Sequence, residues 1–191
     1  MPRPPNPDLE ERILKAARKL WKEGGESGLT MRAVAEAAGT NTPAVYRRFR
    51  DREDILRALL QRIRLEFAAV LKAALSPEDA CERYLDYALS HPHEYELFYR
   101  YEYELFYSAS SVRAGARNDV GRPARDAMKQ KLAENFGGVP KDYVRLTTSL
   151  WMLAHGAAML MIAKTILPKN VEKSRAIFTA SVAALLERPR L

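Results

Sequence analysis

Residues 30–56, which read TMRAVAEAAGTNTPAVYRRFRDREDIL, hold two short helical patterns that meet at a glycine. Thr30 is a suitable N-cap for the first helix, and Gly39 stands where a helix end favours a left-handed residue. Thr42 is a suitable cap for the second helix, with Pro43 in its first turn. The pattern predicts a helix-turn-helix motif, whose second helix fits the major groove of DNA.

Arginines follow the second predicted helix, as expected of a surface that binds phosphates. We expect Ala44 and Arg47, with the residues at the start of that helix, to lie nearest the base edges. We expect Tyr46, Arg48 and Arg52 to contact phosphates. The predicted DNA-binding residues are Thr30, Arg32, Thr40, Asn41, Thr42, Pro43, Ala44, Tyr46, Arg47, Arg48 and Arg52.

The charge of the chain is positive and unevenly distributed. The 191 residues carry a formal net charge of +7. Residues 1–64 hold fourteen basic and nine acidic residues, residues 76–107 hold two and eight, and residues 108–191 hold fourteen and six. A basic N-terminal third is typical of a DNA-binding domain. For the basic C-terminal part, a solvated helix surface is the simpler interpretation.

The rest of the chain predicts helices separated by proline and glycine, without a competing strand pattern. A first helix with an apolar stripe is expected from Leu9 to Trp21, and the glycines at positions 24, 25 and 28 should end it. Later helices are expected over residues 52–75, 77–90, 94–107, 119–136, 141–167 and 169–187. We therefore predict an all-α protein of about nine helices, with a three-helix helix-turn-helix domain over residues 1–51 and a C-terminal helical bundle over residues 52–191.

Several function classes find no support in the sequence. Cys81 is the single cysteine, which excludes an internal disulfide and favours a reducing cytoplasm. We find no signal peptide before the first helix and no apolar run of about 18 residues that would span a membrane. His91 and His93 lie near two glutamates, but the cysteine or second histidine pair typical of a metal site is missing. We therefore expect a cytoplasmic protein without enzymatic activity, metal or cofactor.

A second pattern extends over the N-terminal third, where it comprises Arg12–Ala17, Trp21, Gly24–Gly25, Thr30–Arg32, Ala38–Gly39, Val45–Phe49 and Asp51–Leu56. These residues resemble the tetracycline-repressor (TetR) family of bacterial regulators. Thr40 and Asn41 stand in the turn where that family has a small hydrophobe and a serine. Arg48 replaces a histidine, and Arg52 replaces a lysine. These changes keep or raise the positive charge, so they bear on the bases that are read rather than on phosphate binding.

The resemblance implies a repressor whose last two helices pair across a twofold axis and whose middle helices enclose a small-molecule pocket. Trp151, His155 and Gly156 are similar to the Trp…His-Gly element of one C-terminal subgroup of the family. Independently, the helix expected over 141–167 is apolar nearly all round, which favours a homodimer over a monomeric core. The predicted dimer interface comprises Leu150, Ala157, Leu160, Phe178, Val182 and Leu185.

Residues 94–107 are the best candidate for an effector site, because two similar aromatic and acidic segments follow each other there. Tyrosines and a carboxylate can enclose a small apolar, aromatic or cationic molecule. The alternative is that these aromatic residues pack in the core. Methionines of the helix over 141–167 could add an adaptable wall. The predicted ligand-binding residues are Tyr95, Phe98, Tyr99, Tyr101, Trp151, Met152, His155 and Met159.

Two functions remain open from the sequence. The first is a dimeric transcriptional repressor that leaves its double-stranded operator DNA when a small molecule binds. The second is a helical DNA-binding protein without a small-molecule effector, controlled by a protein partner or by its abundance. A cavity lined by residues between 95 and 162 favours the first function, and a solid core there favours the second.

Overall fold

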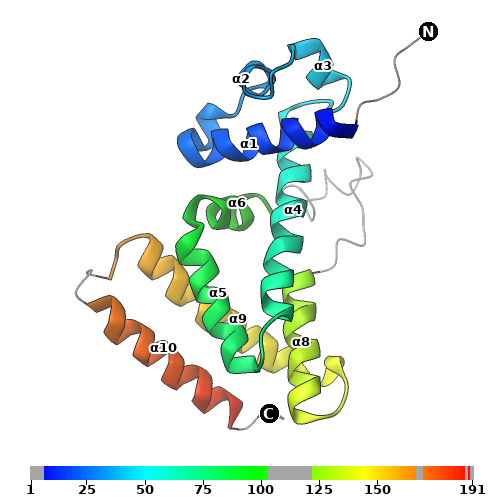
Figure 1. Cartoon of the computed structure of the whole chain (residues 1–191). Coiled ribbons are helices and arrows are strands. Elements are labelled where there is room, and N and C mark those ends of the chain that lie inside the picture. Colours follow the sequence, from blue (N-terminus) through cyan, green and yellow to red (C-terminus); the bar gives the residue numbers. More distant parts are fainter. Residues whose placement is uncertain (1–6, 103–121, 167–169, 188, 190–191) are drawn as a thin grey trace. The chain divides into compact units, whose positions relative to one another are not determined.

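The computed structural model describes residues 7–102, 122–166, 170–187 and 189. In these ranges it contains nine α-helices, one 3₁₀ helix and no strand, which confirms the all-α prediction (Figure 1). The elements are α1 (Pro7–Gly28), α2 (Met31–Ala37), α3 (Thr42–Tyr46), α4 (Arg52–Lys72), α5 (Pro77–Ser90), α6 (Pro92–Glu102), α8 (Pro123–Phe136), η2 (Pro140–Tyr143), α9 (Val144–Ile162) and α10 (Val171–Leu186). None of the described helices combines the length and apolar character that a membrane span requires.

The described residues form two compact units. Unit 1 contains residues 7–63 and 93–102, and unit 2 contains residues 64–92 and the described residues from 122 onward. Helix α4 contributes residues to both units. Unit 1 is therefore larger than the N-terminal domain expected over residues 1–51, because it also includes the first part of α4 and nearly all of α6.

The end of α1 differs from the prediction. The helix continues to Gly28, whereas we expected the glycines to end it soon after Trp21. The interruption is confined to Gly25, which has φ 57° and ψ −142°. Glycine adopts this left-handed backbone without the steric cost that a Cβ atom would bring. The glycines therefore kink the end of α1 instead of stopping it.

The bounds of two helices in unit 2 differ from the prediction. Helix α9 ends at Ile162 rather than at 167, and its first turn is replaced by the 3₁₀ helix η2. Helix α8 begins at Pro123, directly after its N-cap Arg122. The expected helical residues 103–107 and 119–121 lie outside the described residues.

Unit 1 is built around a core of apolar side chains from its first three helices. Helix α1 packs on α2, and α2 packs on α3. Fully or almost fully buried are Ile13, Ala17, Trp21, Leu29, Val34, Val45 and Phe49. The core fixes the orientation of α2 and α3, which leaves their outer faces to solvent.

Helix α6 is attached to α1 through a buried carboxylate. The side chain of Glu94 is 1% exposed, and Arg18 donates to both of its oxygens at 2.6 and 3.1 Å. The Nζ atom of Lys22 lies 2.9 Å from Oε1 of the same carboxylate. Burial by itself would raise the pKa of Glu94, but the hydrogen bonds and charges of Arg18 and Lys22 outweigh it and lower the pKa. We call these three side chains the Glu94 cluster.

Trp21 strengthens the same contact between α1 and α6. Its indole Nε1 donates a 2.7 Å hydrogen bond to the carbonyl of His93, at the start of α6. The ring of Tyr101 meets the Trp21 ring edge-on, with centroids 5.7 Å apart. The first and last turns of α6 are thus both held against α1.

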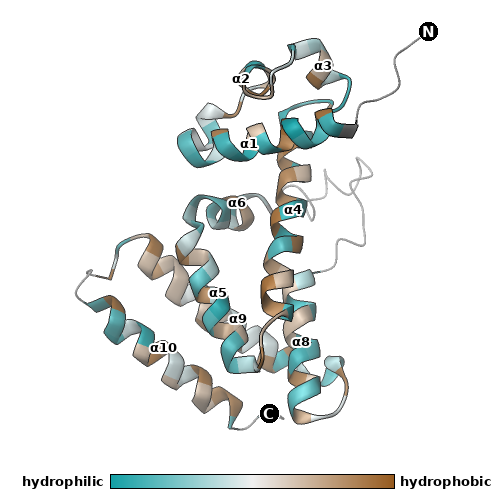
Figure 2. Cartoon of the chain, viewed as in Figure 1, coloured by the Kyte–Doolittle hydropathy of each residue, from teal (hydrophilic) through white to brown (hydrophobic). Residues whose placement is uncertain are grey.

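Unit 2 is a helical bundle in which α5 and α9 form the central pair. Helix α9 also packs on α8 and α10. It is white to brown along most of its length in Figure 2, as expected of a helix buried on more than one side. Leu85, Leu132, Leu150 and Phe178, from the four helices, are almost completely buried. The bundle therefore owes its cohesion mainly to apolar packing.

Replacing Glu94 by glutamine should destabilise the protein by about 2 kcal/mol at neutral pH, because Arg18 and Lys22 lose their shared carboxylate. Both cations keep partial access to water, which limits the cost. Since the pKa of Glu94 is lowered on folding, its stabilisation is present above the ordinary value of 4.5 and is lost as the pH falls through the lowered value.

Thermal unfolding between pH 7 and pH 3 tests this expectation. The variant should lose its disadvantage relative to the wild type at the acidic end of the range. Glu96→Gln is the matched control, because Glu96 pairs with Arg100 on the surface of the same helix. Equal melting temperatures for the two variants at pH 7 would contradict the stabilising role of the Glu94 cluster.

Candidate DNA-binding surface and effector cavity

The turn between α2 and α3 has the geometry that the sequence predicts. Thr30 caps α2, and its Oγ1 accepts a 3.1 Å hydrogen bond from the backbone N–H of Ala33. Gly39 follows the end of α2 with φ 62°, in the left-handed region. The next N–H, that of Thr40, donates to the carbonyl of Ala35 at 2.9 Å. Helix α2 therefore ends abruptly, and the chain reverses toward α3.

Arg12 stabilises this turn by hydrogen bonds to its backbone carbonyls. Its Nε donates to the carbonyl of Ala38 at 3.1 Å, and its Nη2 donates to the carbonyls of Ala38 and Gly39. A Cβ atom at Gly39 would lie 3.2 Å from Nη2, so a side chain there would crowd the guanidinium as well as strain the backbone. Sequence reasoning assigned no role to Arg12, because its partners are 26 and 27 residues away.

Helix α3 begins one residue earlier than expected. Its N-cap is Asn41 rather than Thr42, and Asn41 Oδ1 accepts a 2.9 Å hydrogen bond from the N–H of Ala44. Asparagine and threonine both suit this position, so composition alone did not decide between them. The helix ends at Tyr46, although the N–H of Phe49 still donates to the carbonyl of Val45 at 2.9 Å.

The prediction that Ala44 lies near the base edges is wrong. Its side chain is only 5% exposed, so it packs into the core of unit 1 instead of facing outward to base edges. The other predicted DNA-binding residues are accessible at least in part. Exposed are Thr30, Arg32, Asn41, Pro43, Tyr46 and Arg47, and half-buried are Thr40, Thr42, Arg48 and Arg52. Ten of the eleven candidates thus contribute to the surface of α2, the turn, α3 and the residues just after it.

This surface carries a net positive charge. Residues 30–52 contain five arginines against two acidic residues. Two of the arginines form ion pairs: Arg52 lies 2.7 Å from Glu26, and Arg50 lies 3.1 Å from Asp51. Hydrogen bonds from Tyr101 and Arg52 lower the pKa of Glu26, which stays ionised at neutral pH. Arg32, Arg47 and Arg48 supply the other three positive charges of this range.

The predicted effector residues fall into two groups. Tyr95, Phe98, Tyr99 and Tyr101 belong to α6 in unit 1, and Trp151, Met152, His155 and Met159 belong to α9 in unit 2. In the first group Tyr95 is buried and Tyr99 is 55% exposed. One of the carboxylates of this segment, that of Glu94, is already paired with Arg18 and Lys22. Part of the aromatic and acidic segment in which we expected an effector is thus used to attach α6 to α1.

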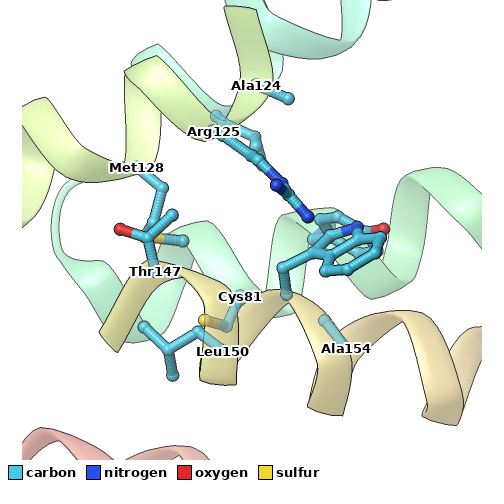
Figure 3. A pocket seen from close by; sticks show the side chains of 10 residues that line it. Cys81, Ala124, Arg125, Met128, Thr147, Leu150 and Ala154 are labelled. Atoms are coloured by element: carbon cyan, nitrogen blue, oxygen red, sulfur yellow. The ribbon is translucent and has the colours of Figure 1, made fainter. Parts of the chain in front are cut away.

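A small cavity in unit 2 is lined by residues of α4, α5, α8 and α9 (Figure 3). Its volume is about 30 Å³, enough for about one or two water molecules. Trp151 is the predicted residue that lines it, whereas the side chain of Met152 is 56% exposed. The lining residues are Leu71, Cys81, Tyr84, Ala124, Arg125, Met128, Thr147, Leu150, Trp151 and Ala154.

Among the described residues that line this cavity, Arg125 is the one that carries a charge. Its guanidinium carbon lies 4.0 Å from the centre of the Trp151 ring, within cation–π distance. Burial raises the pKa of the Cys81 thiol to about 12, and the charges of Glu78 and Glu82 add to this shift, so the thiol is neutral. The described part of the lining is accordingly mostly apolar, with the guanidinium of Arg125 as its charged group.

Two further polar groups adjoin the cavity wall. Thr147 is 3% exposed, and its Oγ1 is buried without a hydrogen-bond partner among the described residues. The ring of His155 stacks on Trp151, with centroids 5.6 Å apart. Burial lowers the pKa of His155, which favours the neutral imidazole beside the indole. Sequence reasoning found Trp151 and His155 but missed Arg125 and Thr147, since neither belongs to a recognisable motif.

The predicted dimer interface needs a correction. Phe178 and Val182 are each 2% exposed and Leu150 is 1% exposed, so these side chains already pack inside their own chain. They are not available to the centre of a contact with a second copy. Ala157 and Leu185 are half-buried, and Leu160 is 48% exposed. Among the large apolar side chains of α9 and α10, those on the surface are Val144, Met152, Leu160 and Ile177.

The described residues contain no group of three or more histidine, cysteine, aspartate and glutamate side chains that could hold a metal ion. His91 instead stacks on Tyr87, with ring centroids 4.5 Å apart, and its Nδ1 lies 3.1 Å from the Tyr87 carbonyl.

Sequence comparison identifies both parts of the chain. Residues 13–59 match the profile of bacterial regulatory proteins of the tetR family. Residues 77–185 match the profile of the tetracyclin repressor-like C-terminal domain. No curated protein sequence matches the chain significantly.

Solved structures share the fold over nearly the whole chain. A protein of unknown function from Rhodococcus sp. RHA1 has a TM-score of 0.73 and 20% identity, with 100% of both chains covered. A TetR-family transcriptional regulator from Streptomyces coelicolor has a TM-score of 0.64 and 22% identity, with 95% of this chain and 99% of that chain covered.

A TetR variant from Acinetobacter baumannii AYE, solved in complex with minocycline, has a TM-score of 0.61 and 19% identity, with 94% of this chain and 96% of that chain covered. The two family profiles together span both units, and the helix-turn-helix of unit 1 lies within the first of them. The chain therefore belongs to the TetR family of bacterial transcriptional regulators.

Proposed function

We propose that the protein is a dimeric repressor that binds operator DNA through α2 and α3 and leaves it when a small molecule binds in unit 2. The observation that carries the proposal is the fixed turn at Gly39, which leaves the arginines around α3 on the surface. As a regulator of bacterial genes, it would work in the cytoplasm without catalysing a reaction.

The residues of the surface divide into two roles. Thr42, Pro43 and Arg47 are proposed to lie at the base edges in the major groove, since Pro43 and Arg47 are exposed and Thr42 is partly exposed. Tyr46 and Arg48 are proposed to contact phosphates, which set the register of the protein on DNA but carry little sequence information. Arg52 joins them if DNA phosphates compete with Glu26 for its guanidinium.

Dimerisation supports this function, because one helix-turn-helix covers only a half-site and a second copy supplies the other about 34–36 Å away. The proposed contact uses the exposed apolar residues of α9 and α10, with Leu160 and Ile177 at its centre. Ala176, Ala180 and Ala184 are also exposed on α10, and such small side chains allow two helices to approach closely.

Helix α4 is the proposed connection between effector and DNA, since it has residues in both units. An effector in unit 2 that tilts α4 would alter the spacing of the two recognition helices. Such an effector must bind the released form more tightly than the DNA-bound form, or it cannot shift the equilibrium. The minocycline complex of the Acinetobacter protein gives a precedent for small-molecule binding in this fold.

A second candidate function is regulation without a small-molecule effector. The cavity volume of about 30 Å³ favours it, because pockets for drug-sized ligands usually measure about 300–1,000 Å³. In this case operator binding would depend on protein abundance or on a protein partner. A screen in which no small molecule changes operator affinity would support this second function over the first.

Replacing Arg48 by alanine should weaken binding to all DNA sequences similarly, because a phosphate contact is lost. The slope of log affinity against log salt should become shallower by about one unit. Arg47→Ala should instead change which bases are preferred. Fluorescence anisotropy with operator and shuffled DNA at several salt concentrations measures both effects, with Arg83→Ala in unit 2 as a control. A changed base preference for Arg48→Ala, with an unchanged slope, would contradict these roles.

Replacing Ile177 by arginine should convert the dimer to monomers, because two like charges would meet in an apolar contact. Sedimentation equilibrium measures the association, and operator binding should fall in parallel. The matched control is Leu75→Arg, because Leu75 is an apolar residue that is 89% exposed outside α9 and α10. Val182→Arg is unsuitable, since Val182 is buried and the variant would fail to fold. A wild-type protein that is monomeric on DNA would refute the proposed interface.

A further inference from the structure

We propose that Glu26 sets the strength of DNA binding, because its carboxylate holds the Arg52 guanidinium for which a DNA phosphate must compete. Glu26 is then a positioning residue, since it acts on DNA through Arg52 instead of touching DNA itself. The inference rests on the proposed function and deepens it, because it assigns a regulation to the phosphate contact at the start of α4.

The ion pair joins two segments of unit 1 that are 26 residues apart in sequence. Glu26 directly follows the kink at Gly25 near the end of α1, and Arg52 is the first residue of α4. Nη2 of Arg52 donates to Oε1 of Glu26 at 2.7 Å. The side chain of Arg52 is 36% exposed and that of Glu26 is 46% exposed, so a phosphate can reach the pair. An exposed ion pair is weak enough to be exchanged for another anion.

The surroundings of Arg52 favour such an exchange. As the first residue of α4, Arg52 lies where the helix dipole is already positive, so its guanidinium gains from a nearby anion. The described bond to Glu26 uses Nη2, whereas Nε is buried without a hydrogen-bond partner in the described part of the chain. A phosphate has several acceptor oxygens and can bond to two guanidinium nitrogens at once. It is therefore a stronger partner than the carboxylate that it replaces.

A second hydrogen bond holds the Glu26 carboxylate in place. Its donor is Tyr101 of α6, and together with the bond from Arg52 it lowers the pKa of Glu26. Burial raises the pKa of Tyr101 and the bond to Glu26 raises it further, so the hydroxyl keeps the proton that it donates. The Tyr101 ring also packs edge-on against Trp21. The carboxylate is thus charged at neutral pH and held beside Arg52 before DNA arrives.

Competition between carboxylate and phosphate should appear in the salt dependence of binding. When Arg52 moves from Glu26 to a phosphate, a counterion leaves the DNA, but the freed carboxylate attracts a cation from solution. The two changes largely cancel, so Arg52 adds little to the slope of log affinity against log salt. Without the carboxylate the release is uncompensated, and the slope should become steeper by about one unit.

Replacing Glu26 by glutamine tests the proposal on the full chain, because glutamine keeps the size of the side chain and removes its charge. Fluorescence anisotropy measures binding to a duplex selected from a random DNA pool and to a shuffled duplex, at several salt concentrations. We expect Glu26→Gln to bind both duplexes about 3- to 5-fold more tightly than the wild type, with the steeper slope.

Two further variants separate competition from a general effect of charge. Glu53→Gln is the matched control, because Glu53 is exposed in the first turn of α4, next to Arg52, and the described carboxylate partner of Arg52 is Glu26 instead. It removes the same charge and should change affinity and slope less. In the background of Arg52→Gln, Glu26→Gln should have no larger effect than Glu53→Gln, since the residue through which it acts is gone.

The proposal is overturned if Glu26→Gln weakens binding, if it raises the affinity no more than Glu53→Gln does, or if its effect persists without Arg52. Any of these results with a wild type that binds DNA would leave the proposed function intact. A wild type that binds no sequence from the random pool at low salt would instead refute DNA binding, and this inference with it.

Discussion

Two backbone carbonyls at the end of α2 must find partners at the place where the chain reverses, and Arg12 supplies them. This constraint determines the direction of α3. A helix end leaves its last carbonyls without intrahelical donors. Because the left-handed Gly39 ends the helix and reverses the chain, no further turn of α2 supplies those donors. With the turn held by Arg12, the short α3 needs little stability of its own to present Pro43 and Arg47 in a fixed orientation.

The aromatic segment of α6 illustrates how one composition serves two different purposes. Tyrosines beside glutamates are typical of ligand cages, but here Glu94 and Tyr101 attach α6 to α1. The DNA-binding helices are therefore supported by a helix far along the chain, and unit 1 is discontinuous in sequence. Any change that moves α6 has a direct physical route to α1, because the buried carboxylate cannot leave Arg18 and Lys22 without a large desolvation cost.

Local signals in the sequence predicted the helices, the Thr30 cap and the left-handed Gly39, because capping and backbone conformation depend on near neighbours. Contacts between distant residues could not be predicted in the same way. The helical spacing did not reveal that Ala44 faces the core, or that Phe178 and Val182 pack within their own chain. An amphipathic pattern shows which residues are apolar, but it does not tell whether the apolar face meets the same chain or a second copy. Arg125 escaped notice for a similar reason, since its significance arises only from its position over Trp151.

The chain has two tryptophans, and they fall in different units. The indole of Trp21 is 2% exposed and donates to a carbonyl, whereas that of Trp151 lies beneath a guanidinium in the wall of a cavity. Their fluorescence should therefore differ in emission wavelength and in accessibility to quenchers. Either indole can be changed to phenylalanine to leave a single intrinsic reporter. The molecule thus carries its own pair of optical probes, with which the unfolding of the two units can be followed separately and without an attached dye.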